Sequence, residues 1–306
     1  MAIISTGKSD WDFEVTWTKG SLASYLSGVK TKSMPWGSLT SSSATSASSS
    51  NANSPPVKPV TGVFASTSSS WLSILNGSHS TLSDPTSSSH TGGIGGSSDD
   101  TAPETVLVFP DYTLVTGVGR TQADAQALYD TALAPGARPG NTPPEMGTWV
   151  IPYGVVVLLC SHKRRDNRCA IAAKTLETSF CQVLASRGWQ ADTRLEDPTV
   201  EMGTDPLEGF KGTAEEKEAH IRSQLKGLQN EKRALILKNS HMGGHKFAGN
   251  CIIYTPAGWG VWYGRVTPHE VEAIVTQTIE GGKILPKLLR GGVNISKPGC
   301  RSLNEW

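Results

Sequence analysis

The chain contains 306 residues, a length typical of two domains, and its 28 basic and 27 acidic side chains leave a net charge of +1. This balance argues against nucleic acid and anionic membranes as partners. No apolar run approaches the roughly 18 residues of a membrane span, and residues 1–10 carry neither a signal-peptide core nor an Arg-rich transit pattern. These features predict a cytoplasmic protein.

The number of cysteines also favours a cytoplasmic protein. The five cysteines are an odd number in a long chain without a signal peptide, which argues against a disulfide framework. A reducing compartment, in which some of the cysteines serve as metal ligands, is the better interpretation. The five are Cys160, Cys169, Cys181, Cys251 and Cys300.

The first part of the chain is predicted to form a partial N-terminal α/β domain, made of residues 1–38 and 104–135. The elements of residues 1–38 cannot bury their apolar faces alone, so we expect the chain to begin inside a domain. Residues 39–103 are rich in Ser, Thr and Gly and cannot bury enough apolar area to offset their chain entropy, which predicts a disordered insertion. The candidate elements are strands at 2–5, 105–109 and 113–115 and helices at 21–26 and 122–133.

Residues 148–295 are predicted to form a second domain, after a stretch rich in Pro and Gly. Continuous apolar runs, typical of strands buried on both faces, alternate with segments of helical spacing. The last helix has a complete start signal in Thr267, Pro268 and Glu270. The order β-α-β-α-β-β-β-α predicts an α/β sandwich of the thioredoxin kind, followed by a C-terminal tail at 296–306. The candidate strands are 154–159, 190–195, 234–237, 251–254 and 261–263, and the helices are 169–187, 214–229 and 267–280.

Two pairs of metal-binding side chains lie in loops that follow predicted strands. Cys160 ends the first strand of the second domain, and Cys169 lies where the next helix begins. The helix N-terminus and the basic run of the same loop favour the thiolate form of cysteine, which binds metals. His241 and His245 flank two glycines after a later strand. We expect the two loops to meet at one end of the sheet. The basic run comprises Lys163, Arg164, Arg165 and Arg168.

Two thiolates and two imidazoles suit a 2Fe–2S cluster with Cys on one iron and His on the other, the Rieske pattern. A single zinc ion held by the same four side chains in a structural or interaction module is an alternative. A thiol-redox enzyme that uses Cys160 or Cys169 is a third, although the Cys-x-x-Cys motif is missing. Arg165 and Asp166 are expected to form an ion pair that holds the loop, and Cys181 and Cys251 to face the core.

The motifs of these loops resemble those of the fungal and plant sucrase/ferredoxin-like family. The resemblance rests on Cys160-x8-Cys169 with His162 inside it, on His241-x-Gly-Gly-His245-x-Phe-Ala-Gly-Asn, and on Trp-Tyr-Gly-Arg-Val-Thr-Pro at 262–268. It implies a thioredoxin-like 2Fe–2S ferredoxin with ligands Cys160, Cys169, His241 and His245. It also implies a role in redox homeostasis, in a family with a cytosolic and a mitochondrial branch. The chain departs from the family pattern at Ser161 and Ala170, where the family usually has glycine.

The resulting hypothesis is an electron carrier rather than an enzyme, served by an unidentified reductase and an unidentified acceptor protein. A His ligand should couple reduction to protonation and raise the potential above that of an all-Cys cluster. The C-terminal Trp306 resembles the terminal signal by which the cytosolic iron–sulfur assembly machinery recognises some of its clients. The alternative for this residue is an exposed tail.

Overall fold

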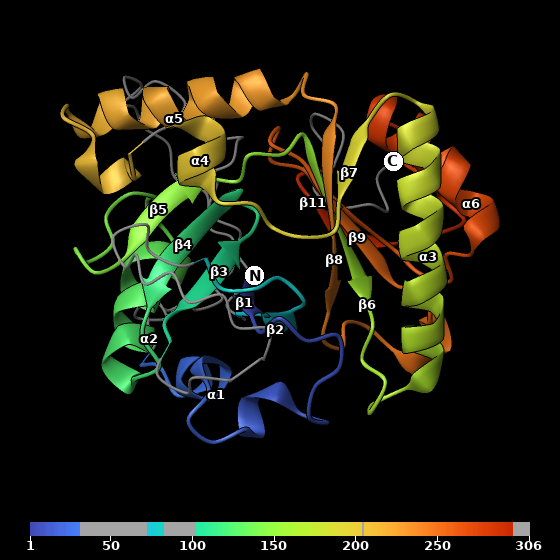
Figure 1. The fold of residues 1–306 in the computed structure, drawn as a ribbon, viewed down its shortest axis with the longest axis horizontal. Coiled ribbons are helices and arrows are strands. Elements are labelled where there is room, and N and C mark those ends of the chain that lie inside the picture. The colour runs from blue at the N-terminus through green and yellow to red at the C-terminus, as the bar shows by residue number, and fades with distance from the viewer. Residues whose placement is uncertain (31–71, 83–101, 204, 296–306) are drawn as a thin grey trace, which may run out of the picture.

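The computed structural model describes residues 1–30, 72–82, 102–203 and 205–295, and places their strands in one 11-stranded sheet. The strand order is β11-β10-β9-β6-β8-β2-β1-β3-β4-β5, and β7 pairs with β8 (Figure 1). The strands are β1 (Ala2–Ser5), β2 (Ile74–Gly77), β3 (Glu104–Val108), β4 (Thr113–Val118), β5 (Gly147–Val150), β6 (Val155–Cys160), β7 (Gln190–Asp192), β8 (Arg233–Asn239), β9 (Cys251–Tyr254), β10 (Gly260–Tyr263) and β11 (Leu289–Val293).

Helices cover both faces of this sheet. They are α1 (Leu22–Ser27), α2 (Gln122–Leu128), α3 (Asn167–Ser186), α4 (Pro198–Met202), α5 (Ala214–Leu228) and α6 (Pro268–Ala273), with short 3-10 helices at Val15–Trp17, Leu207–Gly209 and His245–Phe247 and π-helical turns at Tyr129–Leu133 and Ile274–Glu280. None of the described helices has the length and apolarity that crossing a bilayer requires.

The C-terminal half confirms the predicted thioredoxin-like α/β arrangement. Strands β10, β9, β6 and β8 lie side by side, with β9 antiparallel to both of its neighbours and β6 parallel to β8. The side chains of β6 are buried on both faces. Val157 packs on one face in the same core as Phe180 of α3, and Leu158 packs on the other in the same core as Leu225 of α5. This burial explains the uninterrupted apolar run of β6.

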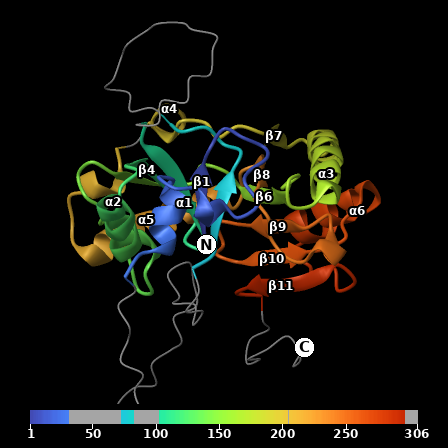
Figure 2. The same ribbon diagram turned by 90° about the horizontal axis from the view of Figure 1, so that it is seen from below.

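The N-terminal half extends the same sheet rather than standing apart from it. Its own core gathers side chains of α1, α2 and strands β1, β3 and β4, such as Leu26, Leu128 and Val106. Strand β5 pairs antiparallel with β4, so the passage to the C-terminal strands comes after Val150 rather than at residue 148. Figure 2 shows the strands of the two halves following one another along one sheet.

Strand β2 corrects the prediction for residues 39–103. The Ser-rich composition predicts disorder throughout, but residues 74–77 pair parallel with β1 and contact β8 through Gly77 and Asn239. Leu75 is only 7% exposed and shares a core with Ile3 and Leu158. The four-residue strand is stabilised by neighbours on both sides, which local composition cannot reveal. Residues 39–71 and 83–101 of the predicted insertion lie outside the described residues.

The buried His79 is expected to make stability depend on pH. Its ring is 1% exposed, with Nε2 3.3 Å from the carbonyl oxygen of Thr105, and burial lowers its pKa from 6.5 to about 4. Between these values the unfolded chain takes up a proton that the folded chain does not. The free energy of unfolding should therefore fall by about 3 kcal/mol as the pH drops from 6.5 to 4. Denaturant melts at several pH values should show this slope in the native chain and a flatter one in His79→Gln. Equal slopes would contradict the prediction.

Candidate metal centre

Cys160 and Cys169 are both placed by backbone hydrogen bonds. Cys160 is the last residue of β6, and its N–H donates to the carbonyl oxygen of Asn250 at 3.1 Å. Cys169 is the third residue of α3, and its N–H donates to the carbonyl oxygen of the N-cap residue Asp166 at 3.0 Å. Both thiols are buried, at 1% and 0% exposure. The loop between strand and helix therefore holds two sulfur atoms at a fixed place in the interior.

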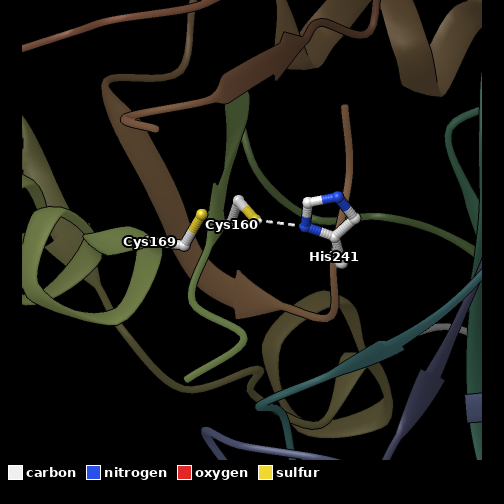
Figure 3. A group of neighbouring side chains, drawn as sticks. All are labelled: Cys160, Cys169 and His241. Atoms are coloured by element: carbon white, nitrogen blue, oxygen red, sulfur yellow. Dashed lines mark hydrogen bonds between the residues drawn. The ribbon is translucent and has the colours of Figure 1, made fainter. Parts of the chain in front are cut away.

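His241 joins the two cysteines from a different strand. It follows β8, which lies parallel to β6, so the two loops leave the same end of the sheet. His241 Nδ1 lies 3.8 Å from Cys160 Sγ, and the ligand atoms of Cys160, Cys169 and His241 all lie within 4.8 Å of one another (Figure 3). This spacing allows one metal centre to contact all three residues.

His245, the fourth predicted ligand, stays a prediction. The backbone of His245 begins the short 3-10 helix His245–Phe247, four residues after His241, but its side chain lies outside the described part of the structure. The thiols of Cys181 and Cys251 are not in the group, as expected for core residues, and burial raises the pKa of both. Cys300 lies outside the described residues.

Hydrogen bonds, rather than the basic run, favour a thiolate at Cys160. The Cys169 thiol has the largest effect, and His241 and the backbone of Met242 act in the same direction. Together they outweigh burial and lower the pKa of Cys160 to about 4. The pKa of Cys169 is raised, because its thiol donates to Cys160 and because it is buried. The pair therefore loses one proton readily, and the proton that stays on Cys169 would be released on binding a metal.

The arginines of this loop are neutralised by nearby carboxylates. Arg164 pairs with Asp10 and Asp12, and Arg165 pairs with Glu14. The expected Arg165–Asp166 ion pair is wrong. Asp166 instead caps α3 and pairs with Arg168, which places its carboxylate beside the helix start.

His162 has a structural role that the sequence did not reveal. Its ring is 1% exposed and makes an edge contact with the indole of Trp11. Its Nδ1 accepts from the N–H of His241 at 3.2 Å, and its Nε2 lies 2.9 Å from the carbonyl oxygen of Trp11, to which it donates. Both ring nitrogens are occupied, so His162 is not available as a ligand. It links residues 9–14 to residues 160–169, which we call the cysteine loop, and to residues 240–250 between β8 and β9, which we call the histidine loop.

Replacing His162 with phenylalanine should destabilise the protein. The variant keeps a ring of similar size but removes the hydrogen bonds that the His241 N–H and the Trp11 carbonyl make to His162, at about 1–3 kcal/mol for each group. The free energy of unfolding from urea melts should fall by about 2–4 kcal/mol. The same substitution at the exposed His269 is the control and should change it by less than about 0.5 kcal/mol. Equal effects at the two positions would contradict the role assigned to His162.

The surroundings of the group fit an iron–sulfur cluster. Asn250 Oδ1 accepts from Trp262 Nε1 at 3.1 Å, while its Nδ2 is buried with no partner among the described residues. A Cβ at Gly243 would lie 2.4 Å from the Trp262 ring and 3.0 Å from Asn250 Oδ1, so the histidine loop packs directly on this amide. The backbone oxygen of Asn250 accepts from the N–H of Cys160, so the residue that carries this amide pairs with a predicted ligand, and an amide N–H is the kind of donor that the sulfide of a cluster accepts.

Comparisons with known proteins agree with the motifs. The family model described as sucrase/ferredoxin-like matches residues 1–291. "Altered inheritance of mitochondria protein 32" of Meyerozyma guilliermondii is 30% identical over 139 residues, which are 45% of this chain and 35% of that protein. The protein of the same name from Clavispora lusitaniae is 31% identical over 136 residues, 44% of this chain and 34% of that protein. The matches thus span about a third of the length of these relatives.

Among solved structures, a thioredoxin-like [2Fe-2S] ferredoxin from Aquifex aeolicus is similar to this chain, with 18% identity and a TM-score of 0.28. The similarity covers 48% of this chain and 98% of that one.

Proposed function

Because the chain belongs to the sucrase/ferredoxin-like family, we propose that it binds a 2Fe–2S cluster and carries single electrons between partner proteins. The observation that carries the proposal is the convergence of Cys160, Cys169 and His241, whose ligand atoms lie within 4.8 Å of one another. His245, four residues after His241, would complete the set.

A 2Fe–2S group supplies one-electron chemistry to such a site. The chain supplies a buried pocket in which Cys160 already favours the thiolate and Cys169 releases the remaining proton. A histidine ligand keeps one ring nitrogen away from the metal, and that nitrogen can take up a proton when the charge of the site falls on reduction. Burial of both thiols keeps water and oxidants from the sulfur atoms.

An anaerobic preparation analysed for iron, sulfide and zinc tests the proposal. We expect about two irons and two sulfides per chain and, after dithionite, an electron-paramagnetic signal with the low average g value of Cys₂His₂ clusters. An all-Cys signal would move the ligand assignment to another cysteine. One zinc and no iron per chain, in protein from a host that assembles iron–sulfur clusters, would contradict the electron-transfer function and support the zinc-stabilised structural module.

The contact between Cys160 and Cys169 supports one second candidate, a thiol-redox enzyme. A thiolate beside a thiol is the arrangement that exchanges with disulfides. Reduction of insulin by dithiothreitol separates this function from electron transfer. A rate enhancement that survives in metal-free protein and disappears in Cys160→Ser would favour the enzyme.

The partners and the location of the protein are further proposals. The relatives carry a name that refers to the inheritance of mitochondria, which supports the mitochondrial alternative beside the cytoplasmic one. Fractionation of fungal cells that produce the chain would decide between them. Trp306 lies outside the described residues. If it is read by the assembly machinery, its deletion should lower the iron content of protein made in a fungal host and leave chemically reconstituted protein unchanged.

A further inference from the structure

Three positively charged side chains gather around one aromatic ring beside the histidine loop. Lys246 Nζ lies 5.1 Å from the centre of the Phe247 ring, the Arg265 guanidinium carbon lies 5.1 Å from it, and that of Arg290 lies 3.3 Å from it. We call these four residues the Phe247 cluster. The cations come from the histidine loop, from the segment after β10 and from β11.

The Phe247 cluster is held in place by the backbone that also shapes the site. The N–H of Arg265 donates to the carbonyl oxygen of Phe247 at 3.2 Å, and its Nε donates to that of Lys246 at 3.3 Å. A Cβ at Gly264 would lie 3.0 Å from Arg290 Cγ and 3.2 Å from Phe247 Cβ, so glycine is what lets the arginine chain lie there. The cations are therefore fixed to the histidine loop rather than scattered over the surface.

The three charges are exposed and have no counter-ion of their own. Lys246, Arg265 and Arg290 are all exposed, and none of them forms an ion pair with another described residue. The cysteine loop differs, because its three arginines are paired with carboxylates. Like charges held close together repel one another, and an approaching anionic surface relieves this repulsion.

We propose that the Phe247 cluster is the docking surface for an acidic redox protein, which exchanges one electron with the site through the histidine loop. The proposal rests on the proposed electron-transfer function. Electron transfer weakens steeply with distance, so a partner must bind close to the ligands, and Lys246 directly follows His245. Guanidinium groups stacked on a ring present their N–H donors outward, where carboxylates can accept them.

The test measures the second-order rate at which a reduced plant-type 2Fe–2S ferredoxin, used as an acidic probe, passes one electron to the oxidised protein. In stopped-flow experiments at low salt, Lys246→Gln/Arg265→Gln/Arg290→Gln should lower this rate about tenfold and flatten its dependence on ionic strength. The control triple, Lys211→Gln/Lys226→Gln/Lys283→Gln, removes the same charge from exposed lysines on and before α5 and after the last helix. It should change the rate less than about twofold.

A binding measurement separates this proposal from the function on which it depends. The dissociation constant for the oxidised ferredoxin, measured by calorimetry, should rise about tenfold in the first triple only, and iron analysis shows separately whether the cluster is present. If the protein contains no iron but the first triple still weakens ferredoxin binding, the electron-transfer function alone would be refuted. Equal effects of the two triples, or salt-independent rates, would overturn the docking surface. Binding to phosphatidylserine vesicles that exceeds binding to the ferredoxin would replace the protein partner by a membrane.

Discussion

Cys160→Ser and Cys169→Ser are each expected to lose at least about tenfold in iron and sulfide per chain. Mutation of a residue that only orients a metal ligand lowers metal affinity about 10–100-fold. The loss should be at least as large here, because the two cysteines are proposed to be ligands themselves. Both cysteines are buried, and their sulfur atoms lie in one group with the partly buried His241. Colorimetric iron and sulfide assays, with the visible spectrum of the same sample, measure the loss.

Cys181→Ser is the matched control, because Cys181 lies on the same helix as Cys169 but outside the group of three. It should retain iron within the error of the assay. Iron that remains in both ligand variants, or that disappears in the control, would show that the cluster lies elsewhere. His241→Cys extends the experiment: it should keep iron but raise the average g value toward that of all-Cys clusters and weaken the pH dependence of the potential.

Phe180→Ala is expected to cause the largest loss of stability, about 3–5 kcal/mol in the free energy of unfolding. Phe180 is fully buried, at 0% exposure, on the face of α3 that packs with Val157 of β6 in one core. Truncation removes most of the ring and leaves a cavity that the strands on the other side cannot fill. The loss in the free energy of unfolding is measured from the denaturant midpoints of the two proteins. An unchanged slope of the transition checks that unfolding stays two-state.

Ile171→Ala on the same helix supplies the comparison. Ile171 is 61% exposed, so its truncation should change stability by less than about 0.5 kcal/mol. Iron bound per folded chain should be unchanged in Phe180→Ala, because Cys160 and Cys169 belong to a different core cluster from Phe180. A loss below about 1 kcal/mol would mean that α3 packs on the sheet differently.

The sequence predicts the elements of the C-terminal half well, because local rules decide them. The apolar runs of β6 and β8 require burial on both faces, and Gly188 ends α3 with a φ of 77°. The last helix begins where Thr267 predicts, and the Glu270 carboxylate accepts from the Thr267 N–H at 2.8 Å.

The features that the sequence misses depend on contacts between distant residues. Strand β2 exists because β1 and β8 lie on either side of it, although its own segment is rich in serine. Arg165 and Asp166 are neighbours with opposite charges, yet Arg165 pairs with Glu14 and Asp166 caps the start of α3. The Cys160-x-His162 spacing is visible in the sequence, but Trp11, 151 residues away from His162, decides what the ring does.

The contacts between residues 9–14 and the cysteine loop also bear on how the chain can vary in length. They join positions 151 to 154 residues apart, so folding must close a loop of that size before the site is complete. The entropic cost of closure grows only with the logarithm of the length, by about 0.6 kcal/mol for each doubling. Related genes could therefore gain or lose dozens of serine codons between β1 and β3 with little thermodynamic penalty, provided that the four residues of β2 are kept.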